Sequence, residues 1–452
     1  MVVENRNPWT GEVHRYSMMS AAAIEQRLAA AERAFPAWAE LDLGQRGACL
    51  RRVAALLREG KEALARLVTA EMGKLHREAV LEVEKCAGAC EFYAEHAAEY
   101  LRDQAIATEA ARSYVCYQPI GCVLAIMPWN FPIWQVFRFL APTLMAGNVA
   151  LLKHATNVPR CADGIASILR QAGIPEGVFG VLHIDNEQAA AVIADERIRA
   201  VTLTGSERAG RSVAATAGKH LKKCVLELGG SDPFVVLEDA DLDRAVKVAV
   251  ASRYGNAGQT CIAAKRFILV AGIVERFTER FLAEAGKLQP GDPEAPGSNL
   301  APMARADLRD TLHRQVGECL ARGARLQLGG KPGEKDTVYP ATVLAGVGPG
   351  MPAWEEELFG PVASLIRVRD EAEALEVANA TSFGLGASVW TTDLTRGEAF
   401  ARRFIAGACF VNAQVRSDVR LPFGGTRNSG FGRELAGHGI HEFTNIKTVY
   451  VA

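Results

Sequence analysis

The segment Gly258-Gln-Thr-Cys261-Ile carries the side chain best able to form a covalent bond in this sequence. A cysteine that follows a glycine-rich turn and precedes a strand, predicted over 266–270, can expose its sulfur where the strand begins. A cysteine taken alone is more often a buried packing residue. Cys261 is therefore a candidate nucleophile whose interpretation depends on the residues around it.

Glu227, in Leu226-Glu-Leu-Gly-Gly230, is the first candidate partner. It ends an apolar segment predicted as a strand, where burying a carboxylate costs free energy unless the group is paired or used. Two interpretations remain open. The carboxylate either pairs with a lysine such as Lys222, or it is a general base whose pKa is raised by partial burial.

Asn130, in Met127-Pro-Trp-Asn-Phe, is the second candidate. It lies between a predicted strand and a predicted helix, so its side-chain amide could donate to an oxyanion. Taken alone, an ordinary helix N-cap is the favoured interpretation.

Gly205-Ser206 also joins a strand to a helix, and backbone N–H groups at such a helix start suit a pyrophosphate. The GxGxxG pattern is absent there, so this indication is weak by itself.

Alternating strands and helices must position these residues. Apolar strands are predicted at 123–126, 149–153, 178–183, 200–203 and 225–228, with helices at 133–146, 159–171, 187–194 and 208–218. Strand, helix and strand at this spacing predict a parallel sheet that binds ligands at the carboxyl ends of its strands. Helices are predicted before it, from about 17 to 103. A second α/β segment follows, with strands at 233–237, 267–270, 362–368, 387–390 and 407–411. Two further strands are predicted at 113–118 and 448–451.

Composition narrows the possible functions. The chain has 452 residues, enough for two or three domains, and a formal net charge of −1 with no basic tail. Nucleic acid and membrane surfaces are therefore not expected as partners. The polar first 15 residues lack the apolar region of a secretory signal, and ten scattered cysteines indicate reduced thiols, so we expect a cytoplasmic protein. We predict no metal site. A cysteine hydrolase is disfavoured because no histidine lies in the motifs around these candidates.

The candidate segments also form an ordered series along the chain. Asn130, Gly205-Ser206, Glu227-Leu-Gly-Gly, Gly258-Gln-Thr-Cys261, Glu357-Leu-Phe-Gly-Pro and Asn428-Ser-Gly-Phe-Gly follow one another in the sequence. This series resembles the aldehyde dehydrogenase superfamily over nearly the whole chain. Lys153-His-Ala-Thr-Asn-Val-Pro159 and Glu227-Leu-Gly-Gly-Ser-Asp-Pro233 look most like bacterial-type succinate-semialdehyde dehydrogenases. Ser231 replaces the Lys or Asn usual in the wider superfamily, as it does in this narrower group.

The resemblance implies an α/β fold with three parts. A Rossmann-like cofactor domain spans 1–100 and 120–228, an α/β catalytic domain spans 229–425, and a small β oligomerisation arm joins 101–119 to 436–452. A homodimer or homotetramer is expected.

The resemblance also implies a role for each motif. Cys261 is the nucleophile, Asn130 forms an oxyanion hole with the backbone N–H of Cys261, and Glu227 is the general base. The cofactor-binding residues are Lys153 at the adenosine ribose, Gly205 and Ser206 at the pyrophosphate, and Glu357, Phe359 and Trp129 near the nicotinamide ribose.

The substrate and the cofactor are less strongly specified. Arg138 and Trp134 are four residues apart and share a helix face. The resemblance to succinate-semialdehyde dehydrogenases, which carry an arginine at this place, implies that Arg138 binds a distal carboxylate, and Ser417 and Arg420 could complete the anchor. Alternatively, Arg138 pairs with a surface glutamate. Thr156 stands where NAD-preferring members often carry Glu, so no carboxylate there would repel a 2′-phosphate. We therefore expect oxidation of succinate semialdehyde with NADP, or with NAD. The alternatives are glutarate semialdehyde, a neutral aldehyde, or a non-catalytic binding protein on the same fold.

Overall fold

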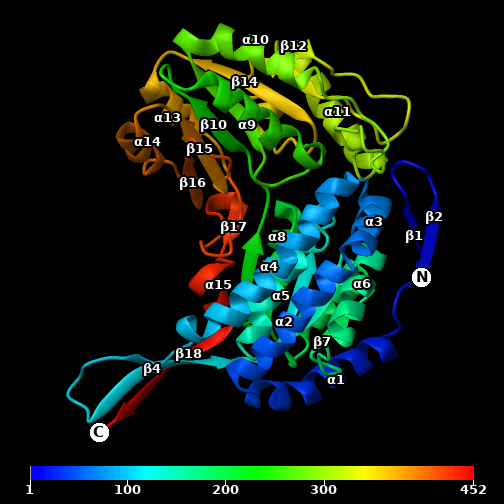
Figure 1. Cartoon of the computed structure of the whole chain (residues 1–452), viewed down its shortest axis with the longest axis vertical. Coiled ribbons are helices and arrows are strands. Elements are labelled where there is room, and N and C mark those ends of the chain that lie inside the picture. The colour runs from blue at the N-terminus through cyan, green and yellow to red at the C-terminus, as the bar shows by residue number, and fades with distance from the viewer. Residues whose placement is uncertain (1) are drawn as a thin grey trace.

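The computed structural model describes residues 2–452 and contains two mainly parallel sheets and a projecting arm (Figure 1). The first sheet has the strand order β17-β9-β8-β5-β6-β7. Its strands are β5 (Cys122–Met127), β6 (Val149–His154), β7 (Phe179–Val181), β8 (Ile198–Thr204), β9 (Lys223–Glu227) and β17 (Gly430–Phe431). All pair in parallel except β17 with β9. The predicted parallel α/β sheet is confirmed, and β17 brings the chain back to it after the second sheet.

Helices surround this sheet. Their apolar residues recur at the helical period, so these helices present apolar faces that pack into the core around the sheet. Ser20 is the N-cap of α1, with its side chain accepting from the N–H of Ala23 at 3.2 Å. The helices of this part are α1 (Ala21–Glu40), α2 (Leu43–Glu59), α3 (Lys61–Met72), α4 (His76–Tyr100), α5 (Trp134–Met145), α6 (Pro159–Gln171), α7 (Asn186–Ala194), α8 (Glu207–Lys219) and the short α15 (Ala436–His441). A hairpin of β1 (Val2–Arg6) and β2 (Val13–Ser17) precedes them.

The second sheet has seven strands in the order β12-β13-β14-β11-β10-β15-β16. On β11, Phe267 and Ile268 enter different apolar cores, so both faces of this sheet are covered. The strands are β10 (Asp232–Val236), β11 (Ala264–Val270), β12 (Arg325–Leu328), β13 (Thr342–Ala345), β14 (Val362–Val368), β15 (Gly386–Trp390) and β16 (Ala408–Val411). The helices are α9 (Leu242–Tyr254), α10 (Val274–Ala285), α11 (Ala306–Ala321), α12 (Pro352–Glu355), α13 (Glu371–Asn379) and α14 (Leu394–Ala401), with short 3-10 turns at Gly255–Gly258, Ala271–Ile273 and Arg427–Ser429.

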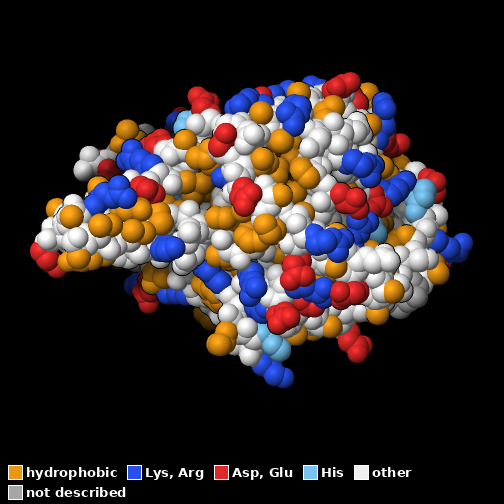
Figure 2. Space-filling model, turned by 90° about the horizontal axis from the view of Figure 1, so that it is seen from below, with side chains coloured by type: hydrophobic (Ala, Val, Ile, Leu, Met, Phe, Trp, Pro, Cys, Tyr) orange, Lys and Arg blue, Asp and Glu red, His pale blue; other side chains and the backbone are white. Residues whose placement is uncertain are grey.

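A three-stranded antiparallel sheet forms the arm, with β3 (Gln104–Ala105), β4 (Arg112–Pro119) and β18 (Thr444–Val451). The last strand begins earlier than predicted and pairs with β4 along its whole length, from Thr444 opposite Pro119 to Val451 opposite Arg112. Ile446 and Tyr450 of this strand are exposed. Hydrophobic side chains gather on the arm, which projects at the left of Figure 2. Within residues 2–452, no helix combines the length and the apolar character needed to cross a membrane.

Candidate active site

A cavity of about 310 Å³ lies between α4, α5, the segment 255–263 and the loop 414–417. Four of the residues singled out from the sequence line it together: Trp134, Arg138, Cys261 and Ser417. Lys85, which sequence analysis did not identify, lines the same cavity. The structure thus joins the candidate nucleophile and three candidate substrate-binding residues in one cavity.

A constrained turn presents Cys261 to this cavity. Asn256 and Ala257 have positive φ values of 53° and 52°, a conformation that side chains disfavour. The Asn256 side chain holds the turn by donating to the backbone carbonyls of Asn130 at 2.9 Å and Gln259 at 3.2 Å. Gly258 must lack a side chain, because a Cβ there would lie 2.4 Å from the Gly360 carbonyl oxygen. The residues before Cys261 are therefore fixed by backbone contacts.

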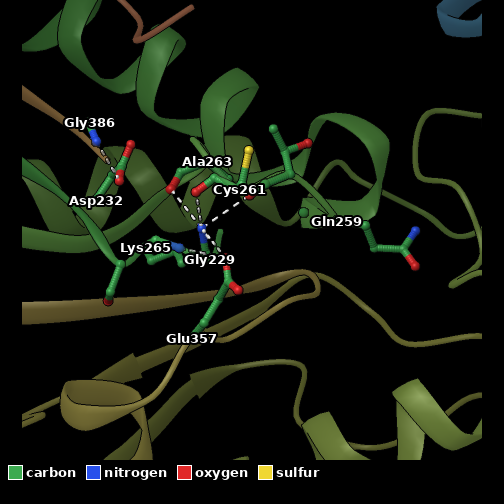
Figure 3. A network of polar contacts seen from close by, with 12 residues as sticks. Gly229, Asp232, Gln259, Cys261, Ala263, Lys265, Glu357 and Gly386 are labelled. Atoms are coloured by element: carbon green, nitrogen blue, oxygen red, sulfur yellow. Dashed lines mark hydrogen bonds and ion pairs between the residues drawn. The ribbon is translucent and has the colours of Figure 1, made fainter. Parts of the chain in front are cut away.

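A buried lysine ties the nucleophile segment to the segment that carries Glu357 (Figure 3). The ammonium of Lys265 donates to the carbonyl oxygen of Cys261 at 2.7 Å and lies 3.2 Å from Glu357 Oε1. The same carboxylate oxygen accepts from the N–H of Gly230 at 3.1 Å. Glu357 is thus held between the turn of Cys261 and the glycines that follow Glu227. Lys265 has no signal in the sequence, because only the fold shows its contact with Glu357.

Burial raises the pKa of the Cys261 thiol to about 12, although the positive charges of Arg138 and Lys265 oppose this shift. The negative charges of Glu357 and Glu227 raise it further. The free thiol is therefore protonated at neutral pH, and the thiolate that attacks a carbonyl must form with the help of a base or of bound ligands.

This pKa leads to a direct test on the enzyme without ligands. Cys261 is almost entirely the protonated thiol at pH 7, since the thiolate fraction falls tenfold for each pH unit below the pKa. We expect the rate of Cys261 alkylation by iodoacetamide to keep rising with pH beyond pH 9, as followed by peptide mass spectrometry. A rate that levels off below pH 8 would contradict this expectation. The peptide is identified by its absence of label in Cys261→Ala.

Glu227 ends β9 and is buried, with 2 % of its surface exposed. Neither carboxylate oxygen has a hydrogen-bond partner among residues 2–452. Burial raises its pKa well above the usual value, against the opposing charge of Arg138. The suggested ion pair with Lys222 is wrong, because the Lys222 ammonium donates to the carbonyls of Asp195, at 2.8 Å, and Ile198.

Asn130 lies beside the nucleophile segment. Its Nδ2 donates to the carbonyl of Gln259 at 3.0 Å, two residues before Cys261. The N-cap interpretation is wrong, because the N-cap position of α5 is Ile133. Glu82 Oε1 instead accepts from the first N–H groups of that helix, at 2.8 Å from Ile133 N and 2.9 Å from Trp134 N.

Arg138 is buried and forms an ion pair through Nε with Glu434, and Nη2 donates to Thr204 Oγ1 at 3.2 Å. Its partner is thus a buried glutamate rather than the surface glutamate considered from the sequence. Removing Arg138 alone would leave Glu434 buried without a cation, which typically costs about 3–5 kcal/mol of stability. Arg138→Ala is therefore a poor probe of substrate binding.

Arg420 does not join the other predicted substrate residues. Its guanidinium binds both oxygens of Asp418, at 2.8 and 2.6 Å, and its side chain is 70 % exposed. It is not among the residues that line the cavity. The expectation that Arg420 completes the substrate anchor is not supported by this position, because an adjacent carboxylate already occupies the guanidinium.

A second cavity of about 330 Å³ contains Lys153 and Ser206 at the carboxyl ends of β6 and β8. Ser206 caps α8 by accepting from the N–H of Ala209 at 3.3 Å, so the remaining N–H groups of this helix start are available to an anion. The other walls of this second cavity are largely aliphatic, which suits an adenosine. Arg208, missed from the sequence, also lines it. These residues fit a dinucleotide.

The other cofactor candidates do not line this cavity, but each has defined contacts in the fold. The N–H of Gly205 donates to the Glu227 carbonyl at 3.0 Å. The rings of Trp129 and Phe359 meet edge to face at 5.7 Å. Thr156 is exposed in the turn after β6, where its carbonyl accepts from the Tyr16 hydroxyl at 2.7 Å.

Comparison with known proteins agrees with this geometry. The family model described as "Aldehyde dehydrogenase family" matches residues 1–449. The chain belongs to the aldehyde dehydrogenase family. The resemblance and the α/β fold predicted from the motifs are therefore confirmed.

Among the relatives of this aldehyde dehydrogenase, succinate semialdehyde dehydrogenase [NAD(P)+] Sad of Escherichia coli (strain K12) is 50 % identical over 98 % of this chain and 96 % of that protein. A probable succinate-semialdehyde dehydrogenase [NADP(+)] of Synechocystis sp. is 48 % identical over the full length of both. A solved structure of succinic semialdehyde dehydrogenase from Streptococcus pyogenes, in complex with NADP+, superimposes with a TM-score of 0.97 at 38 % identity, covering 99 % of each chain.

Proposed function

We propose that this aldehyde dehydrogenase oxidises succinate semialdehyde to succinate, with NADP preferred over NAD. The observation that carries the proposal is the cavity in which Cys261 shares its walls with Arg138, Ser417 and Trp134. A nucleophile there meets the aldehyde end, and the polar side chains meet a distal carboxylate. The names of the E. coli, Synechocystis and S. pyogenes relatives point to the same substrate.

In the proposed reaction, the Cys261 thiolate attacks the aldehyde carbon, and charge develops on the carbonyl oxygen. Asn130 uses one amide N–H on the Gln259 carbonyl, which leaves its second N–H to stabilise that charge with the backbone N–H of Cys261. Loss of a hydride from the carbon bound to Cys261, which a nicotinamide bound beside Glu357, Phe359 and Trp129 would accept, leaves a thioester on Cys261. Glu227 then takes a proton from the water that hydrolyses the thioester. Its burial without a hydrogen-bond partner supports this role, because a raised pKa suits a base near neutral pH.

The preference for NADP is supported by the charges of the second cavity. Its two ionisable lining residues, Lys153 and Arg208, are both cationic, so a 2′-phosphate meets no repulsion from its walls. We propose that Lys153 and Thr156 lie at the adenosine ribose, Gly205 and Ser206 at the pyrophosphate, and Glu357, Phe359 and Trp129 at the nicotinamide ribose. The E. coli relative is named for both cofactors, so NAD remains the second candidate.

We also propose a cytoplasmic homo-oligomer assembled through the arm. The exposed apolar residues Ile446 and Tyr450 on β18 favour burial against another subunit. All ten cysteines are free, which suits a reducing compartment.

The proposal is tested by kinetics on two aldehydes of equal length. We expect kcat/KM for succinate semialdehyde to exceed that for butanal at least about tenfold, because a charged hydrogen bond typically contributes about 1.5–3 kcal/mol. We expect Ser417→Ala to reduce this preference, and NADPH to form faster than NADH at equal cofactor concentration. Equal rates on both aldehydes would exclude the substrate assignment, and faster NADH formation would exclude the cofactor preference.

A further inference from the structure

A lysine that faces the cavity from α4 is held next to Ser417. The Lys85 ammonium donates to Ser417 Oγ at 2.7 Å and lies 4.0 Å from the centre of the Trp134 ring. These two contacts fix the ammonium at the cavity wall although Lys85 as a residue is exposed. The position of the charge is therefore set by two residues already assigned to the substrate cavity.

The carboxylates near Lys85 are already paired with other cations. Glu82 forms an ion pair with Lys74, and Asp418 binds Arg420 through both oxygens. Within residues 2–452, no carboxylate lies within ion-pair distance of Lys85 itself. The positive charge of Lys85 is thus left without a direct counter-ion at this wall.

Three further charged side chains line the same cavity: Arg138, Glu78 and Arg416. Arg138 carries its own counter-ion, Glu434, and its Nε and Nη2 are occupied. Glu78 accepts from the N–H of Asn256 at 3.3 Å, and burial raises the pKa of its carboxyl, which favours the neutral form. An anion that enters the cavity therefore meets the charges of Lys85 and of the exposed Arg416, and of these two only Lys85 is held against Ser417 and Trp134.

We propose that Lys85 is the specificity-determining cation for the distal carboxylate of the substrate, acting together with Ser417. Because the Ser417 oxygen accepts from Lys85, its own hydroxyl hydrogen remains free to donate to the carboxylate. Lys85 and Ser417 then bind the carboxylate with one charged and one neutral donor, and Arg138 contributes its remaining Nη1 group. This inference rests on the proposed function, since it names the residue that recognises the acid end of that substrate.

The test compares Lys85→Met, which removes the ammonium but keeps a long, unbranched side chain, with Lys85→Arg, which keeps the charge. Lys219→Met, at the exposed end of α8, is the matched control. The measured quantity is the ratio of kcat/KM for succinate semialdehyde to that for butanal. We expect Lys85→Met to lower this ratio about tenfold, through a higher KM for the acid, as expected for the loss of one charged hydrogen bond. Lys85→Arg should restore most of it, and Lys219→Met should leave it unchanged.

The outcomes separate the two proposals. If wild type prefers the acid and Lys85→Met keeps that preference, or lowers both kcat/KM values equally, Lys85 only supports the cavity wall and the inference is wrong while the proposed function stands. If wild type has no preference for the acid, the proposed substrate is wrong and the role of Lys85 falls with it. Failure of Lys85→Arg to restore the ratio would contradict a role for the charge.

Discussion

Replacing Cys261 by alanine is expected to lower kcat/KM for aldehyde oxidation by at least about 10⁴-fold, because the proposed route has no covalent intermediate without the sulfur. The turn before Cys261 is held by backbone contacts of Asn256 and Gly258, so the variant should fold normally. Steady-state NADPH formation and the thermal unfolding midpoint measure the two effects separately.

Cys409 provides the matched control, because it is exposed and lies on β16. Cys409→Ala should retain wild-type activity. If Cys261→Ala keeps more than a small fraction of the activity while its unfolding midpoint is unchanged, another group is the nucleophile.

Glu227→Gln is expected to slow steady-state turnover by roughly 10²–10⁴-fold, the usual contribution of a general base. The substitution keeps the shape of a side chain that packs against Gly424, where a Cβ would lie 2.7 Å from Glu227 Oε1. If Glu227 acts on the hydrolytic water, the first turnover still releases NADPH, and stopped-flow absorbance shows a burst of one equivalent per active site followed by a slow phase.

The burst distinguishes two roles for the same carboxylate. A lost burst would mean that Glu227 is needed before hydride transfer, for example to deprotonate Cys261, whose pKa burial raises to about 12. An unchanged steady-state rate would remove Glu227 from the mechanism.

In wild type, hydrolysis should accelerate as the pH rises through the raised pKa of Glu227, because only the ionised carboxylate accepts a proton.

The interior of the fold could be predicted from the sequence because apolar strands alternate with periodic helices. Helix α6 has its predicted bounds, 159–171, and β14 its predicted bounds, 362–368. The arm was harder to predict. Strand β18 begins at Thr444 rather than at 448, because Asn445 and Lys447 pair through their backbones on an exposed sheet and give no apolar pattern.

The site was predicted best where one motif supplies both the residue and its position, as with Cys261. Contacts between segments that are far apart in the sequence could not be predicted from single motifs. The pairing of Arg138 with Glu434, and of Lys85 with Ser417, depends on how α4, α5 and the C-terminal segment meet in the folded chain. The sequence around a helical lysine such as Lys85 does not tell whether its side chain lines a cavity or extends into solvent.

The proposed covalent route is tested most directly by intact-mass and peptide mass spectrometry of Glu227→Gln, mixed with succinate semialdehyde and NADP and then quenched in acid. We expect a mass increase of one succinyl group, located on the peptide that contains Cys261 and absent when NADP is omitted. An unmodified Cys261 peptide after a full burst of NADPH, or a succinyl group on another residue, would contradict it.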